Sequence, residues 1–375
     1  MTFFSSFLGY LTFNKLNKSN NKKKIIFFSE SKNYRNYLIG LIKSLEEEKK
    51  SNLSIIYLTS DKNDIDQISD DIKPIYIGTG FFMALLFYLI DCDILVMTLT
   101  DLNNHKIKKS KFCKNYIYLF HSLVSVHKTY THEAFKNYDI ILCNGEYQKK
   151  ELRYCEKFFN FKKKKLFNTG YLYLEHLYNN KKLKVDNNKI LFAPSWNKSP
   201  RNLFDDYAEK ILDILLDKNY NITLRTHPET LKRSTKNLEK IRKKNLKNIN
   251  FILNTDLENL NSLNDSSLLI TDNGGIALEY IVVHRKPVIY IDYSEKIHNK
   301  FFDKLELETI EDKFKKEIGT TIDISKLNQI EFYITEAKRN FANKLNVVDK
   351  LILEHGLITK NQSRNSKEVI IKLLD

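Results

Sequence analysis

The chain has 375 residues, of which 42% are hydrophobic and 29% are charged, and this length and composition favour two domains over one. The formal net charge is +15, but the basic residues are mainly lysines scattered among asparagines and isoleucines, which argues against a nucleic-acid-binding groove. The four cysteines lack a CxxC spacing and predict buried free thiols in a reducing cytoplasm, and no run approaches the roughly 18 apolar residues of a membrane span.

The first 20 residues form the first predicted element, a helix with an apolar stripe. The stripe is made of Phe3, Phe4, Phe7, Leu8, Leu11 and Phe13, and it is followed by Lys15, Lys18 and the lysines at 22–24. An apolar stripe beside basic residues is typical of a helix that lies in the interface of an anionic membrane. A helix docked on the N-terminal domain, or a frayed end, would give the same pattern, so these interpretations stay open.

Short apolar runs alternate with helical segments through the first half of the chain. Strands are expected at residues 24–28, 53–58, 74–77, 94–97, 116–120 and 140–143, and helices at about 34–49, 81–89 and 147–158. This alternation is typical of a parallel sheet with crossover helices. The longest apolar run, FFMALLFYLI at 81–90, predicts a buried helix or a face packed between domains.

A polar stretch at residues 179–188, NNKKLKVDNN, is the best candidate for a linker, and the alternation restarts after it. Strands are expected at 189–192, 221–224, 250–253, 268–270 and 287–291, and helices at about 203–218, 232–244 and 275–283. We therefore expect an N-terminal Rossmann-like lobe at 21–180 and a second lobe at 181–330. The polar helices expected at 331–375 often cross back to the first lobe in folds of this kind.

Polar or ionisable residues follow four of the predicted strands. Ser195 follows the strand at 189–192, RTHPE at 225–229 follows the strand at 221–224, DNGG at 272–275 follows the strand at 268–270, and His121 follows the strand at 116–120. Doubly wound sheets bind their ligands beyond the carboxyl ends of the strands. The four segments are therefore the candidates for a ligand site.

The strongest unit is SSLLITDNGGIALEYIVVHRKPVIYI at 266–291, which predicts a strand, a tight polar turn, a helix and a second strand. The backbone N–H groups of Asn273, Gly274 and Gly275 would lie at the helix start, where free donors and the helix dipole favour phosphate. Asp272 could cap that helix or hold a ligand hydroxyl, and Glu279 could face the ligand from the first turns. The alternative is a simple turn with a good N-cap.

Arg225 and His227 alternate along a strand end, so both side chains can point to one side. The planar fork of an arginine suits phosphate oxygens, because it donates two parallel hydrogen bonds. His227 precedes Pro228 and is therefore expected to be extended, and it could donate to the same phosphate. A histidine satisfied by a local carbonyl is the alternative.

His121 could take a proton from an acceptor hydroxyl, because the pKa of histidine is close to neutral pH. His127 and His132 lie nearby, but their spacing is neither HxxxH nor HExxH, so we expect no metal site. Gly78-Thr79-Gly80 lacks the third glycine of a dinucleotide fingerprint, and no Walker-type GKS or GKT occurs. Ser195 is not in a GxSxG elbow, which argues against a hydrolase triad.

The motifs APSWNKS at 193–199, LRTHPE at 224–229 and LLITDNGGIALEYIVVHRKPVIYID at 268–292 together resemble the CDP-glycerol glycerophosphotransferases of teichoic-acid and capsule synthesis. Upstream, DILVMTLTDLNNHKIKKS at 93–110 and YIYLFHSLVSVHKTYTHEAFKNYDIILCNGEY at 116–147 look like the N-terminal lobe of related members. The resemblance covers roughly residues 90–300. It implies an α/β fold of the GT-B type, with two doubly wound Rossmann-like lobes and a cleft between them, and peripheral membrane attachment.

The resemblance also implies roles for individual residues. The lobe at 21–180 would hold the acceptor and the lobe at 181–330 the nucleotide donor. The implied catalytic residues are His121 as the base, His227 and Asp272. The implied donor-binding residues are Ser195, Arg225, His227, Asn273, Gly274, Gly275 and Glu279.

The chain departs from the family pattern at three places. The family commonly has His-Gly where this chain has His121–Ser122, and Arg-Pro-His-Pro where it has Arg-Thr-His-Pro at 225–228. It commonly has Asp-Tyr-Ser-Ser where this chain has Asp-Asn-Gly-Gly at 272–275, which removes two hydroxyls. The Asp-x-Gly-Gly form is similar to the corresponding turn of non-hydrolysing UDP-sugar 2-epimerases.

The resulting hypothesis is a transferase that moves glycerol phosphate, or another polyol phosphate, from a CDP-linked donor to a hydroxyl of a cell-surface glycan or polymer. No cofactor or metal is expected beyond the nucleotide-linked donor, and no nucleic acid. The expected location is the cytoplasm, peripherally on the inner face of the cell membrane through the N-terminus. The alternatives are a nucleotide-sugar glycosyltransferase or UDP-sugar 2-epimerase of the same fold, and a basic surface-binding protein without chemistry.

Overall fold

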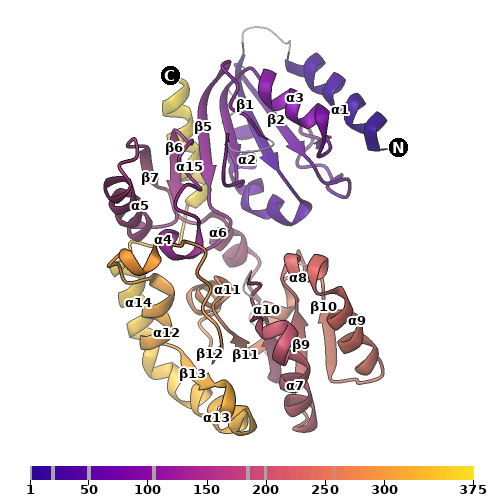
Figure 1. The fold of residues 1–375 in the computed structure, drawn as a ribbon, viewed down its shortest axis with the longest axis vertical. Helices are drawn as coiled ribbons and strands as arrows, with labels where there is room; N and C mark the ends of the chain where they lie inside the picture. Colours follow the sequence, from indigo (N-terminus) through magenta and orange to yellow (C-terminus); the bar gives the residue numbers. More distant parts are fainter. Residues whose placement is uncertain are drawn as a thin grey trace. The chain divides into compact units, whose positions relative to one another are not determined.

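The computed structural model describes residues 2–17, 22–48, 52–103, 107–182, 186–197, 201–256 and 258–375. The chain forms two compact units (Figure 1). Unit 1 comprises Met1–His121, Thr131–His176 and Leu357–Asp375, and unit 2 comprises Ser122–Tyr130 and Leu177–Gly356. Lys18, part of the expected basic cluster, and residues 183–185 of the expected linker lie outside the described residues.

Unit 1 is built on a parallel sheet whose strands are nearly continuous apolar runs, as expected for strands covered on both faces. The described strands are β1 (Lys23–Ser29), β2 (Leu53–Thr59), β3 (Ile75–Tyr76), β4 (Cys92–Met97), β5 (Cys113–Leu119), β6 (Ile140–Cys143) and β7 (Lys165–Asn168). Their order is β3-β2-β1-β4-β5-β6-β7, so the winding direction reverses between β1 and β4. Unit 1 is therefore doubly wound.

The helices of unit 1 cover this sheet. They are α1 (Thr2–Asn17), η1 (Lys32–Tyr37), α2 (Ile39–Glu46), α3 (Phe81–Leu89), α5 (Glu146–Phe158), the first part of α6 (Leu172–Asn179) and α15 (Gln362–Leu374). The C-terminal helix α15 packs on α2, and its Ile370 and Leu374 join Leu41 and Phe27 in one buried cluster. The last helix of the chain thus completes the core of unit 1.

Unit 2 repeats the same arrangement. Its described strands are β8 (Asp186–Phe192), β9 (Asn221–Arg225), β10 (Phe251–Asn254), β11 (Ser266–Thr271), β12 (Val288–Asp292) and β13 (Thr320–Asp323), in the order β10-β9-β8-β11-β12-β13. All pairs are parallel, and the winding direction reverses between β8 and β11. The two doubly wound lobes confirm the predicted fold class.

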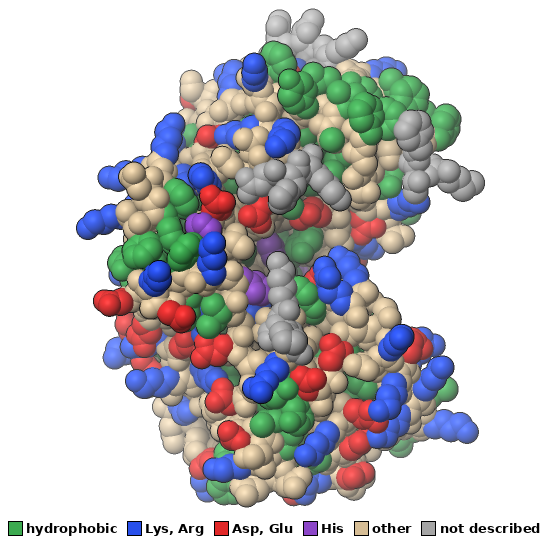
Figure 2. Space-filling model, in the orientation of Figure 1, with side chains coloured by type: hydrophobic (Ala, Val, Ile, Leu, Met, Phe, Trp, Pro, Cys, Tyr) green, Lys and Arg blue, Asp and Glu red, His purple; other side chains and the backbone are tan. Residues whose placement is uncertain are grey.

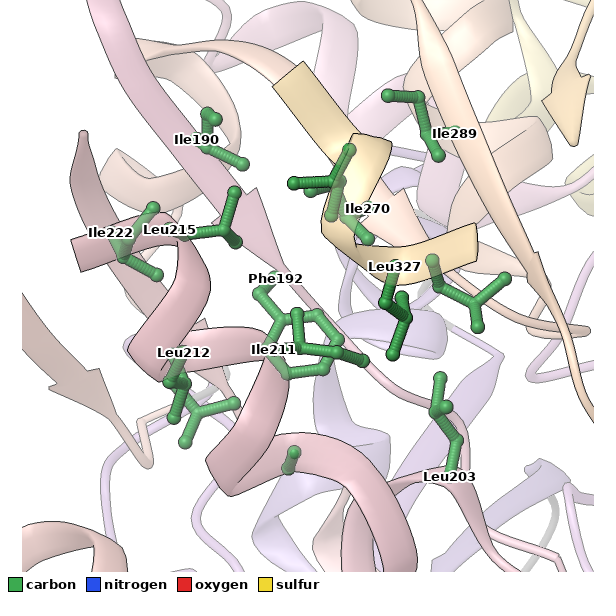
Figure 3. Packing of buried hydrophobic residues seen from close by; sticks show 14 of the residues in the cluster. Ile190, Phe192, Leu203, Ile211, Leu212, Leu215, Ile222, Ile270, Ile289 and Leu327 are labelled. Carbon is green, nitrogen blue, oxygen red and sulfur yellow. The ribbon is translucent and has the colours of Figure 1, made fainter. Parts of the chain in front are cut away.

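The helices of unit 2 pack against this sheet and contribute to an apolar core. The described helices are α4 (Val126–Thr129), α7 (Leu203–Asp217), α8 (Pro228–Arg233), α9 (Thr235–Lys244), α10 (Asn261–Asp265), α11 (Ile276–Glu279), the π-helix η2 (Tyr280–His284), η3 (Phe302–Lys304), α12 (Ile310–Glu317), η4 (Ile324–Gln329), α13 (Ile330–Phe341), η5 (Ala342–Lys344) and α14 (Leu345–Glu354). Figure 3 shows Phe192 of β8, Ile270 of β11 and Ile211 of α7 in this core.

The structure differs from the sequence-based expectations at the weaker elements. The edge strands β7 and β13 were not expected, because each has only four residues and a mixed exposure pattern. The helix expected at 34–49 is a 3-10 helix, η1, followed by α2, and the helix expected at 232–244 begins after Ser234. The polar stretch at 179–188 is shorter than a ten-residue linker, because α6 ends at Asn179 and β8 begins at Asp186.

Residues Ser122–Tyr130, here called the strap, follow β5 in the chain but belong to unit 2. The expected N-terminal lobe at 21–180 contained this segment, and residues 331–356, expected among the C-terminal helices, also lie in unit 2. The strap is held there by hydrogen bonds on both its backbone and its side chains. The Ser125 amide donates to Glu311 Oε1 at 2.8 Å, and the Ile310 amide donates to Ser125 Oγ at 2.9 Å.

The N-terminal helix α1 packs on unit 1 against α3 and β3. Phe13 is buried, and the rings of Phe7 and Tyr10 contact Phe82. Gly9 lies against the Tyr76 carbonyl so closely that a Cβ at this position would be 1.9 Å from the oxygen. The interpretation of α1 as a docked helix is therefore confirmed for this face.

The opposite side of α1, together with α3, carries an exposed apolar face. We define this apolar face by its large exposed side chains: Phe4, Leu8 and Leu11 of α1, and Phe81, Tyr88 and Leu89 of α3. Figure 2 shows hydrophobic side chains gathered over these two helices, at the upper right. The helix expected at 81–90 is buried on one side, through Met83, Leu86 and Phe87, and its other side is exposed. Within the described residues, no helix is long and apolar enough to cross a membrane.

Candidate functional site

The centre of the candidate site is the point where the winding direction of the unit 2 sheet reverses. Phe192 of β8 pairs with Ile270 of β11, so the loops that follow these strands start side by side. The Ala193 amide donates to the Ile270 carbonyl at 2.9 Å, and Thr271 Oγ1 donates to the Ala193 carbonyl at 2.7 Å. Reversal points of this kind are where doubly wound sheets bind ligands.

Ser195 and Asp272 join the two loops directly. The Ser195 amide donates to one oxygen of the Asp272 carboxylate at 2.7 Å, and the Ser195 hydroxyl donates to the other at 3.0 Å. Both residues are buried, with 6% and 3% of their surface exposed. Burial raises the pKa of Asp272, although the two hydrogen bonds from Ser195 oppose that shift. The sequence-predicted Ser195 and Asp272 are thus brought together as one clamp.

The turn after Asp272 leads into the helical segment formed by α11 and η2. Asn273 Nδ2 donates to the Ser294 carbonyl at 2.6 Å, which ties the turn to the loop after β12. The Glu279 amide donates to the Gly275 carbonyl at 3.2 Å, so Glu279 lies in the first turn, where it is buried. The first N–H groups of a helix have no intrahelical acceptor. The predicted roles of Asn273, Gly274, Gly275 and Glu279 in donor binding stay predictions.

His227 begins α8, and its backbone is extended with φ −69° and ψ 145°, which confirms the conformation expected before Pro228. Its Nδ1 accepts a hydrogen bond from the Glu229 amide at 3.1 Å. A ring nitrogen that accepts from an amide carries no proton, so the proton of the neutral ring is on Nε2. The ring lies 6.4 Å from that of Trp196. His227 therefore presents an N–H donor while its other nitrogen caps the helix.

Arg225 is buried at the end of β9, and its guanidinium has partners that the sequence did not indicate. Its Nη1 donates to the Asn259 carbonyl at 2.9 Å and to Ser262 Oγ at 3.2 Å. These bonds tie the end of β9 to the start of α10. The sequence could not reveal this, because the partners lie more than 30 residues away. A role for the guanidinium in phosphate binding stays a prediction.

His121 is the last residue of its segment of unit 1 and follows β5. Its ring contacts the edges or faces of two tyrosines of η1, with centroids 5.0 Å from Tyr34 and 6.2 Å from Tyr37. His127, by contrast, uses Nε2 to contact the Leu307 carbonyl at 3.0 Å within unit 2. His121 thus lies at a strand end, as the sequence predicted, and its aromatic neighbours are a finding of the structure. Its role as a base stays a prediction.

Two residues near the clamp were not singled out from the sequence. Trp196 directly follows Ser195, and the Arg233 guanidinium lies 5.3 Å from its ring centre. It is the single tryptophan of the chain, which was the available signal. Lys296 is half-buried, and burial lowers its pKa, whereas the carboxylates of Asp272 and Glu311 act in the opposite direction. Among the described residues, no group of three His, Cys, Asp or Glu side chains could hold a metal ion.

A family model for CDP-glycerol:poly(glycerophosphate) glycerophosphotransferases matches residues 10–346, which is most of the chain. The chain belongs to this family. Membership makes it a transferase and confirms the resemblance found in its motifs. A comparison with curated proteins gave no significant match.

Solved structures of other proteins share the fold of this family member. The wall teichoic acid polymerase TagF matches with a TM-score of 0.65 and 14% identity, over 98% of this chain and 93% of the other. The S. aureus MnaA–UDP structure matches with a TM-score of 0.57 and 14% identity, over 94% and 97%. The UDP-GlcNAc 2-epimerase from Neisseria meningitidis bound to UDP-GlcNAc matches with a TM-score of 0.55 and 13% identity, over 94% of this chain and 100% of the other.

Proposed function

We propose that this transferase moves glycerol phosphate, or another polyol phosphate, from a CDP-linked donor to a hydroxyl of a cell-surface glycan or polymer. The observation that carries the proposal is the Ser195–Asp272 clamp beside the turn at 272–275, at the reversal point of a doubly wound sheet. That site lies inside the segment matched by the glycerophosphotransferase family model. A phosphate-bearing nucleotide is the ligand class that such a turn suits.

The proposed reaction is an attack by an acceptor hydroxyl on the phosphorus that carries glycerol. The new P–O bond forms as the P–O bond of the diphosphate breaks, CMP leaves, and His121 takes the acceptor proton. On unit 2, the Nε2–H of His227 and the amides of the turn donate hydrogen bonds to the phosphate oxygens. These bonds stabilise the negative charge that increases on the leaving CMP as the P–O bond breaks. Most of the rate enhancement then comes from positioning and electrostatics.

Asp272 is proposed to act by positioning. Both its oxygens already accept hydrogen bonds from Ser195, and burial favours its neutral form relative to an exposed aspartate. Its carboxylate fixes the loop after β8 against the turn after β11. The distance between the Asn273–Gly275 amides and the loop that carries Trp196 is thereby fixed. A donor that contacts both loops requires this fixed distance.

The apolar face of α1 and α3 supports a proposal for the cellular location. Its six large side chains are exposed on unit 1, Lys15 adds positive charge in the last turn of α1, and residues 22–24 add more at the start of β1. Exposed apolar side chains beside lysines favour the interface of an anionic bilayer, where each buried CH₂ contributes about 0.8 kcal/mol. The proposed location is therefore the inner face of the cell membrane, where a lipid-linked acceptor for teichoic-acid or capsule polymers would be at hand.

The test of the proposed function is a calorimetric titration of the purified protein with CDP-glycerol, CMP and UDP-GlcNAc, followed by an assay for CMP release. Binding of the cytidine ligands, with CMP release that depends on added acceptor, is the expected result. Binding of UDP-GlcNAc alone would replace the proposal with the alternative, a glycosyltransferase or 2-epimerase, which the Asp-x-Gly-Gly form of the turn favours. If none of the three ligands binds, the proposal that this site binds a nucleotide-linked donor is wrong.

A further inference from the structure

The middle of the strap is held to the rest of unit 2 by several hydrogen bonds and an ion pair. Besides the two bonds of Ser125, the Asn299 side chain donates to the His127 carbonyl at 3.0 Å, and the His298 amide donates to the Lys128 carbonyl at 3.0 Å. The Lys128 ammonium is buried and contacts the Asp312 carboxylate at 3.0 Å. These contacts fix the path of the strap, because buried hydrogen bonds to backbone groups are costly to lose.

The first residues of the strap run against the turn at 272–275. A Cβ placed on Gly275 would lie 2.7 Å from Ser122 Oγ, and 3.3 Å from both the Leu123 nitrogen and Val124 Cγ1. The backbone of Gly275 is right-handed, with φ −59° and ψ −22°, so any residue could adopt it. Any restriction at this position therefore comes from the space around it and not from its backbone conformation. The space is filled by a hydroxyl that comes from another part of the chain.

We propose that Ser122 is a donor-binding residue, whose hydroxyl donates a hydrogen bond to a phosphate oxygen bound at the turn at 272–275. The identity of the donor in this inference rests on the proposed function. The choice of Ser122 rests on its contact with Gly275 in the strap. The turn itself offers no side-chain hydroxyl, since its residues are Asp, Asn, Gly and Gly. The hydroxyl of Ser122 supplies one at the same point, and a hydrogen bond to a charged acceptor is about twice as strong as a neutral one.

Ser122 and Gly275 lie in contact, so a side chain at position 275 would meet the Ser122 hydroxyl. We therefore expect that a serine at position 275, combined with removal of the Ser122 side chain, restores a hydroxyl next to the turn.

The experiment compares the wild type with Ser122→Ala and with the exchange variant Ser122→Gly/Gly275→Ser in the full-length protein. Calorimetry measures the affinity for CDP-glycerol, for cytidine as the control ligand without phosphate, and for inorganic pyrophosphate. Thermal denaturation of each variant measures whether the strap and the turn remain folded. In the exchange variant, the new Cβ still lies close to Leu123 and Val124, so its thermal stability is the check on that strain.

Ser122→Ala is expected to weaken CDP-glycerol binding by about tenfold, with cytidine binding and thermal stability unchanged. The exchange variant is expected to bind CDP-glycerol within about threefold of the wild type. Equal affinities of the wild type and Ser122→Ala would overturn the inference. The wild type could fail to bind CDP-glycerol but bind pyrophosphate more tightly than Ser122→Ala does. In that case the donor named in the proposed function is wrong, and the role of Ser122 in phosphate binding stands. Binding of neither ligand overturns both.

Discussion

Replacing Asp272 tests whether its carboxylate positions the turn or enters the chemistry. In Asp272→Asn, the amide oxygen can still accept from the Ser195 amide, and the Ser195 hydroxyl can rotate to accept from the new NH₂ group. Both hydrogen bonds of the clamp are therefore kept without a buried charge. In Asp272→Ala, both are lost, and the buried Ser195 N–H is left without its acceptor.

The expected magnitudes follow from these contacts. A hydrogen bond to a charged group is worth about 1.5–3 kcal/mol, and leaving a buried donor unsatisfied costs about 1–3 kcal/mol. Relief from burying a carboxylate offsets part of this loss. We expect Asp272→Ala to lower the free energy of unfolding by about 2–4 kcal/mol, and Asp272→Asn to change it by less than about 1 kcal/mol.

The pH dependence gives the same prediction a second observable. Because the pKa of Asp272 is raised on folding, from an ordinary value of 3.8, the folded state binds more protons than the unfolded state above that value. The contribution of Asp272 to stability therefore decreases as pH rises from about 4 through the raised pKa. Asp272→Asn should lose this decrease, which urea unfolding curves of the two proteins, measured at increasing pH from about 4, would show as a difference between them.

One outcome would refute this reasoning about the clamp. If Asp272→Asn unfolds as easily as Asp272→Ala, the negative charge is required and the two hydrogen bonds do not account for the stability. Turnover separates the remaining roles. A stable Asp272→Asn protein with near-normal CMP release supports positioning, whereas a stable protein without CMP release assigns the carboxylate to the chemistry.

Four further predictions concern other parts of the molecule. His121→Ala should lower turnover by about 10²-fold or more while CDP-glycerol affinity changes little, which single-turnover kinetics and calorimetry measure. His227→Ala should lower stability by about 1 kcal/mol and weaken donor binding, whereas His227→Asn should keep the cap of α8 and weaken donor binding alone, as unfolding and titration would show. Burial lowers the pKa of Lys286 to about 8, so stability should rise between about pH 8 and 10.5, and Lys286→Met should lack that rise in thermal denaturation. Leu8→Ser/Leu11→Ser should reduce sedimentation with phosphatidylglycerol vesicles by about tenfold or more, and equal sedimentation of both proteins would exclude the apolar face.

The fold was predictable because most of its elements have strong local signals. The strands β1, β4 and β11 each contain a run of at least three buried apolar residues, and α3 was placed at its observed bounds. The strands β7 and β13 were not, since each has only four residues and a mixed exposure pattern. Their residues carry no apolar pattern that distinguishes them from a loop.

The parts of the candidate site that lie at the ends of adjacent strands could be predicted from the sequence. The contacts between residues that are far apart in the sequence could not. Ser195 and Asp272 follow adjacent strands, so their proximity follows from sheet topology. The orientation of Arg225 depends on Asn259 and Ser262, which no local pattern connects to it. The contact of Ser122 with Gly275 joins residues more than 150 positions apart, and only the folded strap creates it.

The strap also constrains how the protein is made. Ser125 and Glu311 are 186 residues apart, so at about 5–20 residues per second the strap leaves the ribosome roughly 10–40 s before its partner. During that interval its buried groups, among them the Lys128 ammonium, have no native partners. The residues from 177 onward therefore do not contain all of unit 2, because the strap is synthesised earlier. A chain cut between residues 130 and 177 would yield a second half without its strap. Split or truncated versions of the enzyme should be recovered only when the segment 122–130 is supplied.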